Sequence, residues 1–174
     1  MTDKITSRRR SWNMSRIRSS NTIPELIVRS MLHRIGFRFR VNSKDIVGKP
    51  DIVLPKYRTV IFIHGCFWHQ HLGCKEASRP TSNRKYWNAK LQANVQRDYT
   101  NRCILKREGW HVLRLWECEV EKNPKRIAMR IAKFLGCESK GRAFDVLPSR
   151  QTILKAAQAR AQSIIKPAKP KERP

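Results

Sequence analysis

The sequence from Thr59 to Cys74 is TVIFIHGCFWHQHLGC, and its character changes at Gly65. The residues before Gly65 are mostly β-branched or aromatic, which favours an extended strand that ends at His64. After Gly65, cysteines and histidines alternate with Phe67 and Trp68, a mixture that is unsuited to a hydrophobic core. We therefore expect a strand that carries a functional loop at its end.

The loop contains the ligand types of a zinc site. Cys66, His71 and Cys74 bring two thiols and an imidazole close together in the sequence. Cys118 follows a second predicted strand, over residues 110–116, and stands at a strand end as Cys66 does. We therefore predict that these four side chains bind Zn²⁺. Four protein ligands leave no open coordination position, so the ion should stabilise the fold and take no part in catalysis.

Charge is the strongest global signal in the composition. The chain has 38 Lys and Arg against 13 Asp and Glu, a net charge of +25, which is typical of proteins that bind nucleic acid. A ribosomal or RNA-binding protein would show the same excess. Apolar runs of membrane-spanning length and a secretory signal are missing from the sequence, so we expect a cytoplasmic protein with no membrane partner. An odd number of cysteines, 5, argues against a disulfide framework.

The chain divides into an arm, a domain and a tail. Residues 1–21 form a basic arm, with two interpretations of equal weight: a solvated leader, or an arm that orders against DNA phosphates with Trp12 and Met14 as apolar contacts. Residues 22–138 form one domain. Residues 139–174 are read as a basic, largely flexible tail that adds non-specific DNA affinity, although 149–166 has the composition of a helix.

The domain shows alternating helix and strand signals. We expect helices over 22–35, 83–107 and 123–135, with strands over 37–41, 51–54 and 110–116 beside the strand that ends at His64. Gly36, Gly109 and Gly136 are placed to end the three helices. The expected inner face of the long helix is Trp87, Leu91, Val95 and Ile104.

Three acidic residues have both a structural and a catalytic interpretation. Glu25 lies three residues after Thr22, as in a capping box, and is also a candidate catalytic acid. Asp51 follows Pro50 at the start of an apolar strand, where it either caps a turn or binds a cation. Asp98 is spaced for an i,i+4 pair with Arg102, and a catalytic role is equally open.

Several stretches together closely resemble the very short patch repair (Vsr) mismatch endonucleases. The resemblance covers about residues 8–138, and its most specific part is the string His-Gly-Cys-Phe-Trp-His at 64–69. It also includes Thr22-Ile23-Pro24-Glu25, Pro50-Asp51 and the segment from Gly109 to Cys118. It implies a restriction-endonuclease-like α/β fold of the PD-(D/E)xK type, with a central mixed sheet flanked by helices and a structural zinc site.

The resemblance implies a Mg²⁺-dependent nick on the 5′ side of the thymine in a T·G mismatch, the product of 5-methylcytosine deamination. Asp51 would bind Mg²⁺ together with the main-chain carbonyl of Ile63, where the family carries threonine. His69 would be the general base, because an imidazole titrates near neutral pH. His64 would be a second catalytic histidine, and Glu25 would hold water beside the metal. Asp98 would either orient a catalytic histidine or act through a water molecule.

The same resemblance assigns Phe67, Trp68 and Trp87 to a wedge that enters the base stack at the mismatch. Unstacking is least costly at a mispaired step, so such a wedge favours damaged DNA. Trp87 has the alternative of being a core residue, because it lies one helical turn from Leu91.

Two other functions are compatible with parts of the sequence. A related restriction enzyme would cut a matched duplex, and a zinc-stabilised basic module would bind DNA or RNA without cutting. The family resemblance also implies a bacterial enzyme that acts as a monomer beside a cytosine-5 methyltransferase and mismatch-repair proteins.

Overall fold

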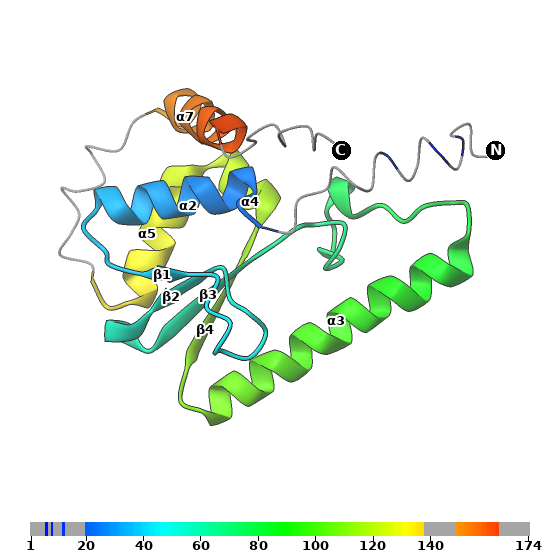
Figure 1. Cartoon of the computed structure of the whole chain (residues 1–174), viewed down its shortest axis with the longest axis horizontal. Helices are drawn as coiled ribbons and strands as arrows, with labels where there is room; N and C mark the ends of the chain where they lie inside the picture. The colour runs from blue at the N-terminus through cyan, green and yellow to red at the C-terminus, as the bar shows by residue number, and fades with distance from the viewer. Residues whose placement is uncertain (1–5, 7, 9–11, 13–19, 138–148, 164–174) are drawn as a thin grey trace, which may run out of the picture.

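The computed structural model describes residues 6, 8, 12, 20–137 and 149–163. Its centre is a four-stranded sheet in the order β1-β2-β3-β4 (Figure 1). The strands are β1 (Arg40–Val41), β2 (Ile52–Leu54), β3 (Thr59–His64) and β4 (His111–Trp116). β1, β2 and β3 pair antiparallel, whereas β3 and β4 are parallel and joined through a long helical crossover. The predicted mixed sheet is confirmed.

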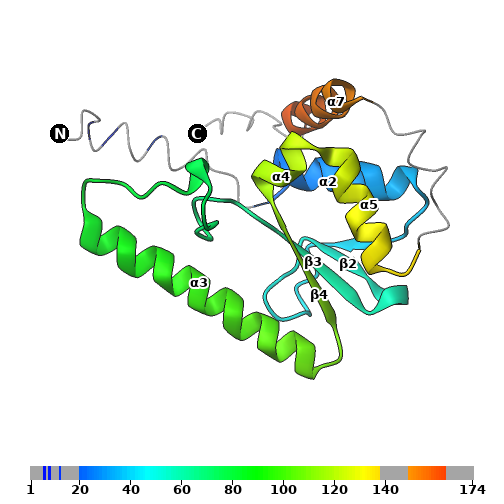
Figure 2. The same ribbon diagram turned by 180° about the vertical axis from the view of Figure 1, so that it is seen from behind.

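Helices cover both faces of the sheet (Figures 1 and 2). Of the described helices, α3 (Arg84–Arg107) covers one side, and the other α-helices gather on the opposite side. These are α2 (Ile23–Arg34), α4 (Glu117–Lys122), α5 (Pro124–Phe134) and α7 (Arg150–Ser163), with short 3₁₀ helices η1 (Pro55–Tyr57) and η2 (Lys75–Ala77) in the connections. The larger core cluster joins α2, α5 and α7 to the sheet, and a smaller one around Val53, Val60 and Leu105 lies under α3.

The first helix begins and ends where its sequence signals lie. Glu25 accepts hydrogen bonds from the backbone N–H and the hydroxyl of Thr22, which forms the predicted capping box. Gly36 has a φ of 84°, the left-handed conformation that ends a helix at little cost to glycine. The backbone N–H of Phe37 then donates to Leu32 O at 2.9 Å and completes the helix end.

The predicted strand over 37–41 is wrong in most of its length, because only Arg40 and Val41 pair with β2. The backbone N–H of Phe37 is used by the end of α2, and its ring is buried in the core in edge-to-face contact with Tyr57. Phe37 therefore serves the helix end and the core, and the ladder starts three residues later.

α3 matches its predicted length but only part of its predicted inner face. Val95 is 43% exposed, while Asn94 and Leu105 are buried together with Leu91. The residues of α3 that face the rest of the protein recur every three or four positions, and Val95 lies one position away from this face. α4 was not predicted at all, although it carries Cys118.

The tail assignment needs a correction over residues 150–163. These residues form α7, whose side chains Ile153, Ala157 and Ala161 join the core cluster against α2. The division into arm, domain and tail otherwise stays a prediction. Arg9, Arg10, Met14, Arg16 and Arg18 lie outside the described residues, as do 138–148 and 164–174. Among the described helices, none combines the length and apolar character needed to cross a bilayer.

Ile153→Asp tests whether α7 belongs to the folded core. Ile153 is 6% exposed, so a carboxylate there is expected to lower the free energy of unfolding by about 2–4 kcal/mol. Urea unfolding of the full chain measures the change. Gln158→Asp adds the same charge on the exposed side of α7 and should leave stability nearly unchanged. Equal midpoints for both variants would show that α7 contributes nothing to the core.

Candidate active site and metal centre

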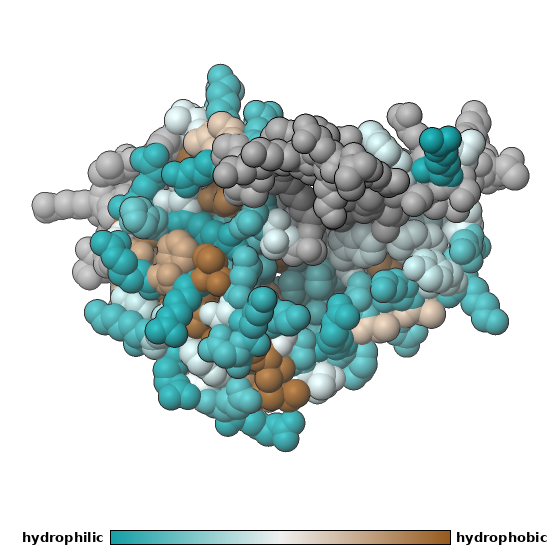
Figure 3. Space-filling model, viewed as in Figure 1, coloured by the Kyte–Doolittle hydropathy of each residue, from teal (hydrophilic) through white to brown (hydrophobic). Residues whose placement is uncertain are grey.

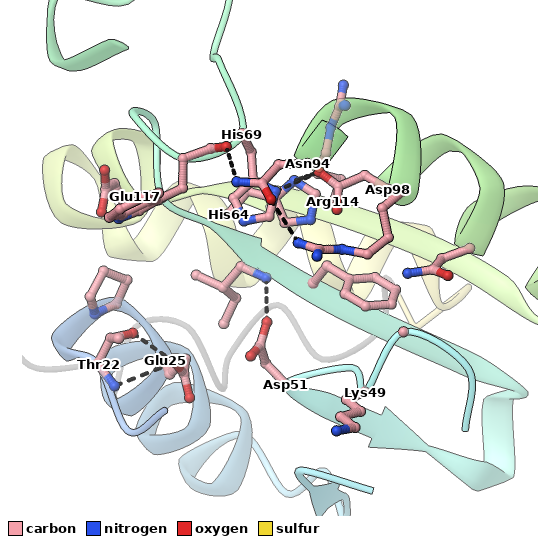
Figure 4. Close-up of a pocket in the computed structure, with 18 of the residues that line it drawn as sticks. Thr22, Glu25, Lys49, Asp51, His64, His69, Asn94, Asp98, Arg114 and Glu117 are labelled. Carbon is pink, nitrogen blue, oxygen red and sulfur yellow. Dashed lines mark hydrogen bonds and ion pairs between the residues drawn. The ribbon is translucent and has the colours of Figure 1, made fainter. Parts of the chain in front are cut away.

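A cavity of about 910 Å³ lies between α2, the loop before β2, the ends of β3 and β4, and α3 (Figure 4). Its lining mixes acids, bases and imidazoles. The acids are Glu25, Asp51, Asp98, Glu117 and Glu121, the bases are Lys49, Arg97, Arg102 and Arg114, and the imidazoles are His64 and His69. Carboxylates of this kind bind hard cations, and the guanidinium and ammonium groups suit phosphate.

Asp51, the residue directly before β2, faces this cavity. Its Oδ2 accepts the backbone N–H of Ile63 at 2.7 Å, a hydrogen bond between neighbouring strands (Figure 4). Burial raises the pKa of Asp51 to about 6 against the opposing effect of this N–H, and the nearby Glu25 carboxylate raises it further. Among the described residues Oδ1 has no hydrogen-bond partner. A half-buried carboxylate with one free oxygen beside a second acid fits a divalent cation.

Glu25 has the structural role that the capping box predicts. It is 3% exposed and accepts hydrogen bonds from the backbone of Asn21 and Thr22, the Thr22 hydroxyl and the Arg29 guanidinium. The same carboxylate lines the cavity that contains Asp51. The cap is therefore confirmed, and the catalytic role of Glu25 stays a prediction.

His69 and Asp98 form a hydrogen-bonded pair between the loop after β3 and α3. His69 Nδ1 lies 2.5 Å from Asp98 Oδ2. Burial acts to raise the pKa of Asp98, but the hydrogen bond and charge of His69 outweigh it and lower the pKa. Asp98 is therefore the ionised acceptor, Nδ1 carries the proton, and Nε2 of His69 is left as the basic nitrogen. The pair predicted with Arg102 is not formed, since that guanidinium lies over the Tyr99 ring.

His64 stacks on His69 with ring centroids 3.9 Å apart and an interplanar angle of 15°. Burial lowers the pKa of His64 to about 3, and positive charge on His69 and Arg114 also opposes protonation. Its Nδ1 is buried without a hydrogen-bond partner among the described residues, 3.9 Å from Asp98 Oδ2. His64 is thus a neutral imidazole whose ring stacks on the ring of His69 and supports it.

Asn94 was missed by sequence reasoning, although it also connects α3 to this loop. Its Nδ2 donates to the main-chain oxygen of Trp68 at 3.1 Å, and its Oδ1 accepts from Arg97. Asn94 lies four residues before Asp98, so α3 holds the adjacent residues Trp68 and His69 with successive turns. The available signal was the helical spacing of Leu91, Asn94 and Asp98, which places a polar residue on the inner face.

Phe67, Trp68 and Trp87 form one aromatic cluster. The centroid distances are 5.1 Å for Phe67–Trp68, 5.5 Å for Phe67–Trp87 and 6.1 Å for Trp68–Trp87. All three side chains are half-buried, and Trp87 is not a residue of the main core. The structure brings the three predicted wedge residues together at one end of α3.

Cys66, His71, Cys74 and Cys118 form the second cluster, with all candidate donor atoms within 4.8 Å of one another. The Cys66 and Cys118 sulfurs lie 3.4 Å and 3.3 Å from His71 Nδ1. Tetrahedral zinc with its usual bond lengths separates sulfur and nitrogen ligands by about 3.5 Å, so the donor set and spacing fit the ion. Burial raises the pKa of the Cys66 and Cys118 thiols, and a cation would offset this cost of forming thiolates.

Neighbouring groups fix this cluster to the strand ends. The His71 ring stacks on Trp116 at 4.1 Å, and Glu117 Oε1 accepts the backbone N–H of Cys66 at 2.6 Å. Glu117 thus joins the end of β4 to the loop after β3, a contact that the sequence did not predict. Cys137 lies elsewhere, beside the Tyr57 hydroxyl, and Cys103 lies on α3.

The sequence is similar to known DNA mismatch endonucleases and nicking enzymes. The family DNA mismatch endonuclease Vsr matches residues 2–75. The Type II nicking enzyme V.XorIIP of Xanthomonas oryzae is 49% identical over 120 residues, 69% of this chain and 88% of the relative. The DNA mismatch endonuclease Vsr of Escherichia coli is 40% identical over 123 residues, 71% of this chain and 76% of the relative. The chain belongs to the Vsr family.

Membership of the Vsr family makes this protein a nuclease that acts on DNA. A second nicking enzyme, V.NmeAIP of Neisseria meningitidis, is 48% identical over 121 residues, 70% of this chain and 86% of the relative. The segment that matches the family includes Asp51, His64, His69 and three of the four residues of the Cys/His cluster. Trp87, Asp98 and Cys118 come from beyond residue 75, and the fold brings them to the same sites.

Proposed function

We propose that this Vsr-family endonuclease nicks one DNA strand on the 5′ side of the thymine in a T·G mismatch and so starts repair of a deaminated 5-methylcytosine. The observation that carries the proposal is the placement of Asp51 and the His69–Asp98 pair in one cavity, with the Phe67–Trp68–Trp87 cluster on the same loop and helix. We assign the chain to the PD-(D/E)xK-type, restriction-endonuclease-like fold on the same basis.

Asp51 and the main chain at Ile63 would hold Mg²⁺, with Glu25 in the same cavity. When bound, Mg²⁺ supplies positive charge that neutralises the scissile phosphate and stabilises the leaving oxygen. Ile63 in place of the family's threonine still offers a main-chain carbonyl but no hydroxyl.

His69 is the proposed general base. Its Nε2 accepts a proton from the attacking water, because Asp98 fixes the proton on Nδ1 and stabilises the imidazolium that forms. Asp98 and His64 restrict the ring from its edge and from its face, so the basic nitrogen keeps one direction. Cys66 and His71 lie on either side of His69 in the chain, and zinc on the four-ligand cluster would immobilise the loop that carries it.

The aromatic cluster is the proposed source of mismatch selectivity. Phe67 makes edge contacts with both tryptophan rings, and Asn94 holds the main chain of Trp68, so inserting the rings requires little ordering on binding. A wedge that enters DNA must unstack two neighbouring base pairs, which costs a few kcal/mol and costs least where one of them is mispaired. A matched duplex would therefore bind the wedge less favourably, by the difference between the two unstacking costs.

The surface around the site suits a polyanion. On the face seen in Figure 3, hydrophilic side chains predominate and apolar patches are small and separate. The charged residues on the exposed side of α3 are all basic, since the one acid of this helix, Asp98, turns to His69. Its cations are Arg84, Lys85, Lys90, Arg97, Arg102, Lys106 and Arg107. We propose DNA as the main partner of a single chain, beside a cytosine-5 methyltransferase and mismatch-repair proteins.

Strand cleavage of end-labelled duplexes tests the proposal. A duplex with one T·G pair in a methylated-site context should be nicked 5′ to the mispaired thymine with Mg²⁺ but not with EDTA. The same duplex with T·A or C·G at that position should stay intact. Equal cleavage of matched duplexes would instead indicate a restriction enzyme, and binding without cleavage in several contexts would indicate a DNA-binding module.

A further inference from the structure

Arg29 is a largely buried cation that contacts two acidic residues of the cavity, Glu25 and Asp51, without lining the cavity itself. Its side chain is 11% exposed, and Nη2 donates to Glu25 Oε2 at 2.7 Å. The same nitrogen lies 3.2 Å from the main-chain oxygen of Asp51, and Nη1 donates to Asn21 Oδ1 at 2.7 Å. One guanidinium therefore joins the start of α2 to the residue directly before β2.

Arg29 contacts the side chain of one acidic residue and the main chain of the other. Arg29 binds the Glu25 side chain directly, but it binds Asp51 through the backbone and leaves that carboxylate directed at Ile63 and the cavity. Two acids that face one space repel each other, and a fixed cation on their far side offsets this repulsion without competing for the cavity.

The guanidinium fork is required for this arrangement. Nη1 and Nη2 point to acceptors on separate segments, and Nη2 also lies 3.4 Å from Asn42 Oδ1 at the end of β1. A lysine carries a single nitrogen and cannot reach these acceptors with the same directions. Nε of Arg29 is buried with no hydrogen-bond partner among the described residues, so the group is held here at a desolvation cost.

We propose that Arg29 is a positioning residue of the Mg²⁺ site, which orients Glu25 and the main chain of Asp51 so that both carboxylates meet one cation. This inference rests on the proposed function. Groups that orient metal ligands typically change metal affinity or activity by about 10- to 100-fold when they are removed. The effect of Arg29 should therefore appear in metal dependence, with DNA affinity in EDTA unchanged.

The experiment compares Arg29→Met and Arg29→Lys with Arg34→Met, which removes the same charge from the exposed end of α2. For each full-length variant, nicking of the T·G duplex is followed against Mg²⁺ concentration. Mn²⁺ binding without DNA is followed by the electron paramagnetic resonance signal of the free ion. Arg29→Met should raise the half-saturating Mg²⁺ concentration and weaken Mn²⁺ binding by about tenfold or more. Arg29→Lys should show a smaller shift, and Arg34→Met none.

Unfolding and DNA binding in EDTA separate positioning from a general structural effect. If Arg29→Met does not fold, Arg29→Lys decides, because it keeps the charge beside Glu25. A folded Arg29 variant with wild-type Mg²⁺ and Mn²⁺ dependence would overturn the inference, as would equal shifts for Arg29→Met and Arg34→Met. If the wild type neither nicks nor binds Mn²⁺, the proposed function fails and the inference falls with it.

Discussion

Asp51→Asn should reduce nicking of the T·G duplex by at least about a thousandfold, equivalent to roughly 4 kcal/mol of lost transition-state stabilisation. The substitution keeps the shape of the side chain, and its amide oxygen can still accept the backbone N–H of Ile63. It removes the negative charge that the proposed Mg²⁺ needs. The rate is measured with saturating DNA across a range of Mg²⁺ concentrations.

The same variant should fold at least as well as the wild type. In the absence of metal, the Asp51 carboxylate is half-buried near Glu25, so a neutral amide relieves a desolvation and repulsion cost. Thermal unfolding in EDTA is the check, and Asp45→Asn provides a matched change on an exposed loop residue. If Asp51→Asn kept nicking activity within tenfold of the wild type, Asp51 could not be the metal ligand.

Cys118→Ala should release zinc and destabilise the whole domain. Metal analysis of the purified wild type should find about one zinc ion per chain, and the variant should have much less. Structural zinc contributes on the order of 10 kcal/mol, comparable with the total stability of a domain this size. Because Cys118 lies in the first turn of α4, directly after β4, while Cys66, His71 and Cys74 follow β3, the ion would tie two strand ends together.

Cys103→Ala is the matched control, since Cys103 lies on α3 outside the cluster. It should keep both zinc and stability. Circular dichroism melting of both variants, with and without a chelator, separates loss of the ion from loss of a cysteine. A wild type purified without zinc, and insensitive to chelation, would show that the cluster is a group of reduced thiols.

The sequence was most informative where structure depends on neighbouring residues. Thr22, Glu25 and Gly36 interact within one or two helical turns, so the bounds of α2 could be predicted closely. The strand before Gly65 and the helix after Asn123 follow equally local signals. Cys118 was predicted as the fourth ligand because it stands at the end of a predicted strand, as Cys66 does, and the structure places it in the cluster. β3 and β4 are parallel, so their ends meet at one edge of the sheet.

Predictions failed where one local signal competed with distant packing. Phe39 and Arg40 alternate as a strand would, but Phe37 was taken by the end of α2 and by the core. Val95 is apolar and was expected on the inner face of α3, but it is exposed. The neighbouring Asn94 is buried instead, where it contacts the loop after β3. Residues 150–163 looked like an appended basic helix, and their few apolar side chains proved sufficient to dock on α2.

The sequence by itself determined the order of the strands and of the helices other than α4, the loop that carries the cysteines and histidines, and the family, because caps, periodicity and motifs act over a few residues. Only the tertiary structure decided which partner each polar group has. Asp98 turns to His69 and away from Arg102, Arg29 reaches the backbone of Asp51, and Glu117 holds Cys66. Such choices depend on which faces of distant segments are buried together, since burial leaves a polar group with only the partners that the fold places beside it.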